Sequence, residues 1–250
     1  MAKQRYFLEL SYDGTNYHGW QRQPNVVSVQ EVIEQALKKV LKQPIALIGC
    51  GRTDAGVHAR AYIAHIDVID PLAADFRAKL NFTLPEAISI QRIWPVVRGL
   101  HAQFSALERT YRYNVHTSKN PFQARFSTYL PVPLTELDWD AMQRDAQLLL
   151  EHTEYRGCCK VPDRHDSTIC RVTAAKFIRT ADDAFYFSIT ANRFLRGMVR
   201  LLTAQLLDIG QGREALEDFA QRLERAERPK RFVYAAAQGL SLDRVRYPEL

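Results

Sequence analysis

Hydrophobic and polar residues recur along this chain with two periods, one typical of helices and the other of strands. The clearest helical period covers residues 28–42, where a capping box formed by Ser28 and Glu31 precedes the apolar positions. A β-prone run at 6–11 comes before this helix and ends at the turn signal Asp13-Gly14. The apolar positions that define the helix are Val29, Val32, Ile33, Ala36, Leu37, Val40 and Leu41.

The two halves of the chain show the same order of elements, β-α-β-β-α-β. In the first half, the strand and helix above precede predicted strands near 45–49 and 60–69, a short helix near 73–81 and a strand near 87–95. The second half predicts a strand at 111–116, a helix at 138–151, strands at 171–180 and 184–191, a long apolar helix from Phe194 to Gly210, a charged helix at 214–226 and a strand at 240–247.

This repeated order predicts an α+β protein built from two ferredoxin-like (βαββαβ) halves with antiparallel sheets. The halves are expected to be domains, 1–104 and 105–250, joined around a central RNA-binding cleft. An irregular segment marked by Pro121, Pro131 and Pro133 follows the first strand of the second half.

The richest cluster of chemical groups is the glycine-rich stretch 49–60 between two predicted strands. It holds three glycines, the carboxylate of Asp54, the cations Arg52 and Arg60, and His58. Glycines at this density indicate a tight loop, and an aspartate beside an arginine is expected to stay ionised. The loop therefore suits a carboxylate nucleophile that faces an anionic substrate. The alternative is a hairpin whose aspartate caps a turn, while the P-loop and dinucleotide patterns are absent.

Three further segments combine aromatic and basic residues. The loop 12–23 and the segment 101–113 mix both kinds, as do surfaces that stack bases and hold phosphates, although such aromatics more commonly pack in a core. Tyr111 and Tyr113 alternate on a predicted strand and so share a face. Arg193, Arg196 and Arg200 recur at helical spacing and are expected to share a face near the start of the long helix.

Composition narrows the class of protein. The 250 residues carry a net charge of +6, which favours a polyanionic partner, although many proteins are mildly basic. No signal-peptide pattern and no membrane-spanning run is present in the sequence. The cysteines, Cys50, Cys158, Cys159 and Cys170, lack zinc or disulfide spacing and are expected to be reduced thiols of a cytoplasmic protein.

Motifs along nearly the whole chain resemble those of the tRNA pseudouridine synthase A family, whose members modify the anticodon arm. The segment Arg52–Ala59 is the most specific match. The other matching residues are Tyr12-Asp13-Gly14-Thr15, Tyr17, Gly19-Trp20-Gln21, Val29-Gln30, Asn81, Leu84-Pro85, His101-Ala102, Phe104-Ser105-Ala106, Arg109, Tyr111, Tyr113, Asn120-Pro121-Phe122, Ala191-Asn192, Phe194-Leu195, Met198-Val199-Arg200, Gly239-Leu240, Val245 and Tyr247-Pro248.

The resemblance implies specific roles. Asp54 matches the catalytic aspartate, Arg52 the arginine that helps to open the target base into the pocket, Tyr111 the tyrosine that stacks on the uracil, and Arg200 the cation that pairs with the aspartate. It also implies a homodimer that binds tRNA, with no cofactor and no metal. The remaining predicted contacts are His101, Ala102, Gln103, Phe104 and Leu240 for substrate, and Arg22, Arg60, Arg109, Arg193 and Arg196 for RNA.

The sequence departs from the family pattern at a few positions. Gln103 stands where the family has an arginine, and Arg193 and Arg196 add two cations before the Met-Val-Arg motif. Residues 152–160 and Ala236-Ala237 also differ from the usual pattern. These changes bear on the target uridine more than on the reaction. The alternatives are therefore a synthase for another RNA site, or a non-catalytic tRNA-binding or tRNA-folding protein.

Overall fold

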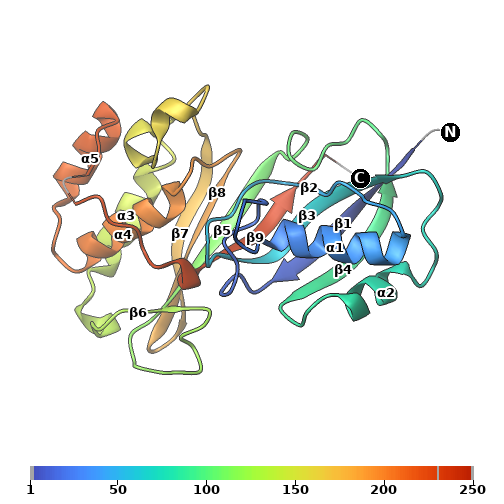
Figure 1. Ribbon diagram of the computed structural model, residues 1–250. Coiled ribbons are helices and arrows are strands. Elements are labelled where there is room, and N and C mark those ends of the chain that lie inside the picture. The colour runs from blue at the N-terminus through green and yellow to red at the C-terminus, as the bar shows by residue number, and fades with distance from the viewer. Residues whose placement is uncertain (1–2, 230, 249–250) are drawn as a thin grey trace. The chain divides into compact units, whose positions relative to one another are not determined.

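The computed structural model describes residues 3–229 and 231–248, and the chain divides into two compact units. The first unit is Met1–Leu107 together with Ser241–Leu250, and the second is Glu108–Leu240. Each combines helices with a mainly antiparallel sheet, so the predicted α+β class is confirmed (Figure 1). The domain boundary between residues 104 and 105 stays a prediction.

The sheet of the first unit has the strand order β4-β1-β3-β9, with the short strand β2 paired to β3. β1 runs antiparallel to both β3 and β4, whereas β9 runs parallel to β3 through the pair His58 and Ser241. The predicted order of elements is confirmed. The bounds are β1 Gln4–Tyr12, α1 Val29–Leu41, β2 Ile48–Gly49, β3 His58–Val68, α2 Phe76–Thr83, β4 Ile88–Val96 and β9 Leu240–Arg246.

Helices α1 and α2 pack together against this sheet (Figure 1). α1 begins as predicted, because the Ser28 hydroxyl accepts the Glu31 backbone N–H at 3.3 Å, and it ends at Lys42, which has a φ of 59°. The Asn81 side chain joins α2 to β4 by donating to the Ile90 carbonyl at 2.9 Å and accepting the Ile90 N–H at 2.7 Å. Polar side chains therefore fix the start of α1 and the last turn of α2.

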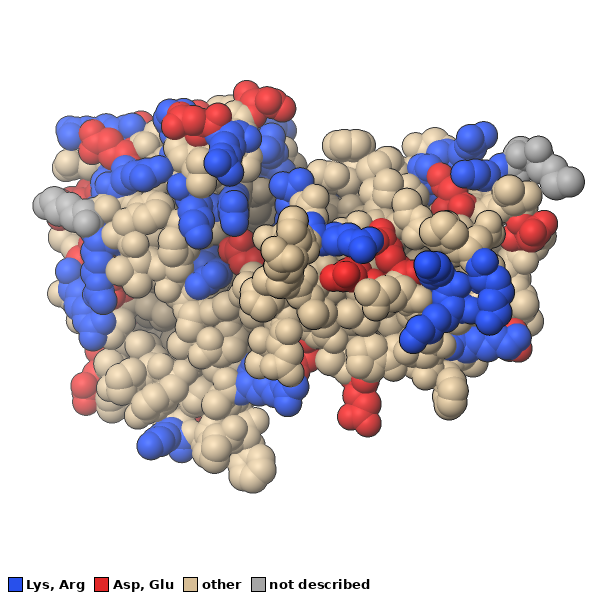
Figure 2. All heavy atoms as spheres, in the orientation of Figure 1, with Lys and Arg blue, Asp and Glu red and all other residues tan. Residues whose placement is uncertain are grey.

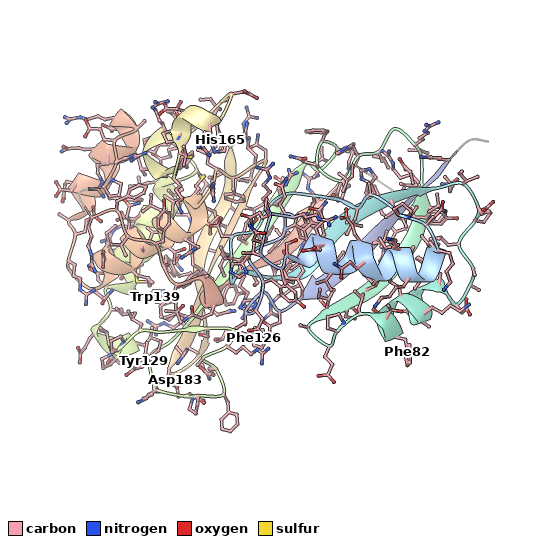
Figure 3. All side chains as sticks on the ribbon, viewed as in Figure 1. Phe82, Phe126, Tyr129, Trp139, His165 and Asp183 are labelled. Atoms are coloured by element: carbon pink, nitrogen blue, oxygen red, sulfur yellow. The ribbon has the colours of Figure 1, made fainter. Side chains whose placement is uncertain are left out.

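The second unit has the strand order β5-β8-β7, with β6 paired to β5. α3 packs on α4 and on β7, and α5 packs on the outer side of α3. Trp139 opens α3 and lies edge-to-face on Phe185 at 5.6 Å, which anchors the helix to the sheet (Figure 3). The bounds are β5 Glu108–His116, β6 Thr128–Tyr129, α3 Trp139–Leu148, β7 Val172–Ala181, β8 Ala184–Ala191, α4 Met198–Gly210 and α5 Leu216–Arg225.

One prediction for the second unit is wrong. α4 begins at Met198, so Arg193 and Arg196 precede the helix and do not share a helical face with Arg200. The break is at Gly197, whose φ of 75° lies in the left-handed region that a right-handed helix excludes. A Cβ at this position would lie 2.6 Å from the Tyr234 ring, so the backbone bend also brings the chain close to that aromatic side chain.

The structure also describes the cysteines and the lengths of the helices. The four cysteines are free and buried, as expected of reduced thiols. Within the described residues, the helices are all too short or too polar to cross a membrane.

Candidate active site

The Asp54 loop connects β2 to β3 and is closed by a tight turn. The Asp54 carbonyl accepts the Val57 N–H at 3.2 Å, and Gly56 within the turn has a φ of 75°. Thr53 is buried, Asp54 is half-buried and Arg52 is exposed. The loop therefore buries the Thr53 side chain, leaves Asp54 partly accessible to solvent and exposes Arg52.

The loop 13–20 supports this turn from one side. Two of its glycines allow the close approach, because a Cβ on Gly14 would lie 2.0 Å from the Val57 carbonyl oxygen and a Cβ on Gly19 would lie 2.4 Å from that of Thr53. The Gly56 N–H also donates to the Tyr17 carbonyl at 3.2 Å. The two segments thus pack backbone to backbone, which only glycine permits at these distances.

His58 joins the same two segments at the start of β3. Its Nδ1 lies 3.0 Å from the Gly14 backbone nitrogen and 3.1 Å from an Asp13 carboxylate oxygen. The same Asp13 oxygen accepts the Thr15 hydroxyl at 2.6 Å, as in an Asx-type turn. The predicted turn at Asp13-Gly14 therefore contacts a side chain at the start of β3, directly after the Asp54 loop.

A second cluster lies at the segment 101–104 of the first unit. His101 Nδ1 accepts the N–H groups of Gln103 and Phe104 at 3.1 and 3.2 Å, and the His101 ring stacks on Phe104 at 4.4 Å. The Phe104 side chain is 80% exposed, so the stacked pair presents one open aromatic ring. Ala102 donates its N–H to His65 Nδ1 at 3.1 Å.

Both histidines of this cluster are held neutral. Burial, together with the nearby Arg5 cation, lowers the pKa of His65 to about 4. Burial and the same cation also lower the pKa of His101. The hydrogen bonds agree, because each Nδ1 accepts a backbone N–H and so carries no proton. The stack of His101 on Phe104 is therefore an uncharged aromatic surface. It lies near the ion pair in which the Arg5 guanidinium is 2.7 Å from the Asp67 carboxylate.

Tyr111 and Arg200 lie in the second unit. Tyr111 is half-buried on β5 and meets Phe194 edge-to-face at 5.2 Å. Arg200 lies in the first turn of α4, donates through Nε to the Ala235 carbonyl at 2.7 Å, and lies 5.5 Å from the centre of the Tyr234 ring. Both side chains are thus oriented by neighbours of their own unit.

Tyr113 behaves differently from Tyr111, although the two share a strand face. Its hydroxyl is hydrogen-bonded to Thr128 at 2.7 Å and donates to the Ala236 carbonyl at 2.9 Å. Burial raises the pKa of the Tyr113 phenol to about 12. Tyr113 is therefore a core residue, in line with the more common role of strand aromatics, while Tyr111 keeps partial exposure.

The predicted RNA-contacting arginines have partners of their own. Arg22 lies 3.7 and 3.6 Å from carboxylates of Glu31 and Glu34, and Arg60 lies 3.9 Å from that of Asp243. In the second unit, Arg109 donates to the Asn192 carbonyl at 2.8 Å.

The remaining predicted residues are Arg193, which is half-buried, Arg196, which is exposed, and Leu240, which is buried at the start of β9. The structure thus brings Arg52 and Asp54 together on one loop and stacks His101 on Phe104. The pairing of Arg200 with Asp54 stays a prediction.

Basic side chains also gather on a surface that the sequence analysis did not include. Figure 2 shows Lys and Arg side chains over the end of α1 and over α2. The last turn of α1 carries Lys38 and Lys39, and α2 carries Arg77 and Lys79. The Lys38-Lys39 pair followed by Lys42 is the sequence signal that could have identified it. Across the described parts of the chain, no group of three or more metal-ligating side chains lies together.

Comparison with known proteins identifies the class. A sequence model described as tRNA pseudouridine synthase matches residues 10–105 and 146–248. The chain is 41% identical to the tRNA pseudouridine synthase A of Bacteroides thetaiotaomicron, over 98% of this chain and 91% of that protein. It is 39% identical to the protein of the same name from Bacteroides fragilis, over 100% and 98% of the two chains.

The matches define an RNA pseudouridine synthase, which is an isomerase. The chain belongs to the tRNA pseudouridine synthase family, and the resemblance found in its motifs is confirmed. A purely RNA-binding or RNA-folding role is therefore not retained.

Proposed function

We propose that this enzyme converts uridine to pseudouridine in tRNA, at positions 38–40 of the anticodon stem-loop, with Asp54 as the catalytic residue. The observation that carries this proposal is the Asp54 loop, a tight turn on which a half-buried carboxylate lies two residues after the exposed Arg52. The names of the relatives support tRNA as the substrate. An ionised carboxylate next to an arginine suits chemistry on a polyanion.

The reaction breaks the bond from C1′ to N1 of the uracil and forms a bond from C1′ to C5. The C5 proton is lost and N1 gains a proton, so the change is balanced without a redox partner. Asp54 attacks C1′, attacks C6 of the ring, or removes the C2′ proton to give a glycal, and all three routes begin from its ionised form. Tyr111 would stack on the uracil, and Arg200 would hold Asp54 charged and aimed.

Access to the base requires the nucleotide to leave its stack. Unstacking costs a few kcal/mol, and stacking on an aromatic side chain returns about 1–3 kcal/mol per base. Tyr111 on β5 and the stacked pair of His101 and Phe104 offer aromatic rings for this purpose. Arg22, Arg60, Arg109, Arg193 and Arg196 would contact the RNA backbone, and Ala102, Gln103 and Leu240 the substrate.

We further infer that each unit is ferredoxin-like and that the enzyme acts as a homodimer in the cytoplasm. The strand order β4-β1-β3-β2, with every pair antiparallel, supports the ferredoxin-like assignment for the first unit. In the second unit, β5 pairs with β8 and β8 with β7, again antiparallel, which is the matching part of that order. The names of the relatives make no statement on oligomeric state.

The direct test is tritium release from tRNA labelled at uracil C5. We expect release by the wild type and none by Asp54→Asn, which keeps the shape of the side chain and its binding of tRNA. Substantial release by a folded Asp54→Asn variant would overturn the assignment of Asp54.

A second candidate is a synthase that acts at another RNA position. Gln103, which is exposed beside the stacked Phe104, favours it because the family has an arginine there. Mapping the modified uridine in the same reaction separates the two, since modification outside positions 38–40 would support this candidate.

A further inference from the structure

Two buried tyrosine hydroxyls reach the Asp54 loop from β1 and β3. The Tyr12 hydroxyl is hydrogen-bonded to the Thr53 hydroxyl at 2.8 Å, and the Tyr62 hydroxyl donates to the Gly51 carbonyl at 2.5 Å. The two contacts fall on either side of Arg52, and the one at Thr53 is directly adjacent to Asp54. Both tyrosines thus use their one polar group on this loop.

The rings of these tyrosines form a packed floor beneath the loop. Trp20 stacks on Tyr62 with centroids 3.9 Å apart, and Tyr12 lies 6.1 Å from Trp20 and 5.8 Å from Tyr62. All three side chains are at most 4% exposed. Because such rings have few rotamers and no free space, their hydroxyls are fixed points rather than mobile groups.

Thr53 is held at its backbone as well as at its side chain. Its carbonyl accepts the backbone N–H of Trp20 at 3.2 Å, so both the carbonyl and the hydroxyl of Thr53 are hydrogen-bonded to residues whose rings belong to the floor. The neighbouring Cys50 N–H donates to the Ile63 carbonyl at 2.8 Å, which ties the beginning of the loop to β3. Asp54 therefore follows a residue that has little freedom to rotate or shift.

Such restraint is more than stability alone requires. A solvent-exposed loop of similar length is commonly held by its own turn, whereas here two buried phenols and the backbone N–H of Trp20 are directed at residues 51 and 53. Catalytic groups need this kind of support, because a displacement of 1 Å can lower a rate by about 100-fold.

We propose that Tyr12, Thr53 and Tyr62 are positioning residues that form a clamp on the Asp54 loop and set the direction of the Asp54 carboxylate. This inference rests on the proposed role of Asp54 in catalysis. None of the three touches the reacting atoms in the proposal; each acts through the loop. The clamp lies entirely within the first unit.

The experiment compares single-turnover tritium release and tRNA affinity across matched variants. We expect Tyr12→Phe and Thr53→Val to lower the rate by about 10- to 100-fold, with the dissociation constant for tRNA within about two-fold of the wild type. Thr53→Ser keeps the hydroxyl and is expected to restore most of the rate. Tyr62→Phe is expected to have a smaller effect, because Gly51 is partly exposed and water can replace the lost donor.

Tyr6→Phe is the matched control. Tyr6 lies on the same strand as Tyr12, and its hydroxyl accepts the Leu72 N–H at 3.4 Å, far along β1 from the loop. The Tyr6→Phe variant loses a phenol hydroxyl, as Tyr12→Phe does, but this hydroxyl makes no contact with the clamp. We expect the rate of Tyr6→Phe to match that of the wild type.

The outcomes separate the clamp from the proposed function. If the wild type releases tritium and the Tyr12→Phe rate is within two-fold of the wild-type rate, the clamp is overturned and the proposed function is not. A rate loss that Thr53→Ser shares with Thr53→Val would also overturn it, because Thr53→Ser retains the hydroxyl that Thr53→Val replaces with a methyl group. The absence of release by the wild type itself would overturn the proposed function. If Tyr12→Phe fails to fold, the two Thr53 variants decide the matter.

Discussion

Asp145 on α3 offers a direct test of how burial acts on a single charge in this protein. The side chain is fully buried, and neither carboxylate oxygen has a hydrogen-bond partner among the described residues. Burial raises the pKa of Asp145 to about 6; Arg144 opposes this effect, and Glu214, Glu217 and Asp138 add to it. The folded protein therefore favours the neutral acid.

The sign of the effect follows from linkage. The folded pKa of about 6 lies above the ordinary value of 3.8, so the folded state binds the proton more tightly than the unfolded state. Stability is undiminished below pH 3.8 and declines as the pH rises toward 6, beyond which it is constant. At about 1.4 kcal/mol per pKa unit, the whole penalty is roughly 3 kcal/mol, and about 2 kcal/mol of it develops between pH 4.5 and 7.5.

The variant Asp145→Asn removes this titration while keeping the shape of the side chain. The buried amide has its own desolvation cost, but that cost is the same at both pH values. We therefore expect the free energy of unfolding of Asp145→Asn, relative to that of the wild type, to be about 2 kcal/mol higher at pH 7.5 than at pH 4.5, so that the variant is relatively more stable at the higher pH. Urea titrations followed by tryptophan fluorescence measure this difference.

Asp140→Asn supplies the control, because Asp140 is exposed on the same helix. Its relative stability should change by less than about 0.5 kcal/mol between the two pH values. A pH dependence of Asp145→Asn equal to that of the wild type would refute the reasoning, since it would mean that the buried carboxyl titrates normally.

Two further predictions concern the backbone bend and the RNA surface. Gly197→Ala should lower the free energy of unfolding by at least about 1–2 kcal/mol and the melting temperature by several degrees, because φ is 75° there and the new Cβ would lie 2.6 Å from the Tyr234 ring; an unchanged melting curve would contradict this. Arg22→Ala should change stability by less than about 1 kcal/mol, because the Arg22 side chain is 61% exposed and its distances to the Glu31 and Glu34 carboxylates are long, 3.7 and 3.6 Å. If Arg22 contacts phosphate, the same variant lowers the salt slope of tRNA binding by about 1, and an unchanged slope would exclude that contact.

The regular elements could be predicted from the sequence because their patterns are local. The helix at 28–42 combines a capping residue with a helical repeat, and the strands near 171–180 and 184–191 flank a clear turn signal. The start of α4 could not be predicted in the same way. Apolar spacing begins at Phe194 and Leu195, and only the left-handed φ of Gly197, together with its close approach to Tyr234, delays the start of the helix to Met198.

The candidate site shows the same division between local and long-range information. The Asp54 loop was evident because its carboxylate, cations and glycines are adjacent in sequence. The hydrogen bonds that support this loop are not evident from the sequence. The Tyr12 and Thr53 hydroxyls are separated by 41 positions and meet only when β1 pairs with β3. Tyr62 was hidden in an apolar strand run, where nothing in the pattern distinguishes a supporting phenol from an ordinary core ring.

The glycines of the loop 13–20 are needed for the conformation of the Asp54 loop, although they are distant from it in sequence. Gly14 and Gly19 are contact points at which a side chain would collide with the Val57 or Thr53 carbonyl. Through these contacts, the carboxylate is placed by an N-terminal segment that carries none of the chemistry assigned to the loop. Under the proposed clamp, the direction of Asp54 depends on the folded first unit, so substitutions that loosen the loop 13–20 are expected to lower the rate of isomerisation before they weaken tRNA binding.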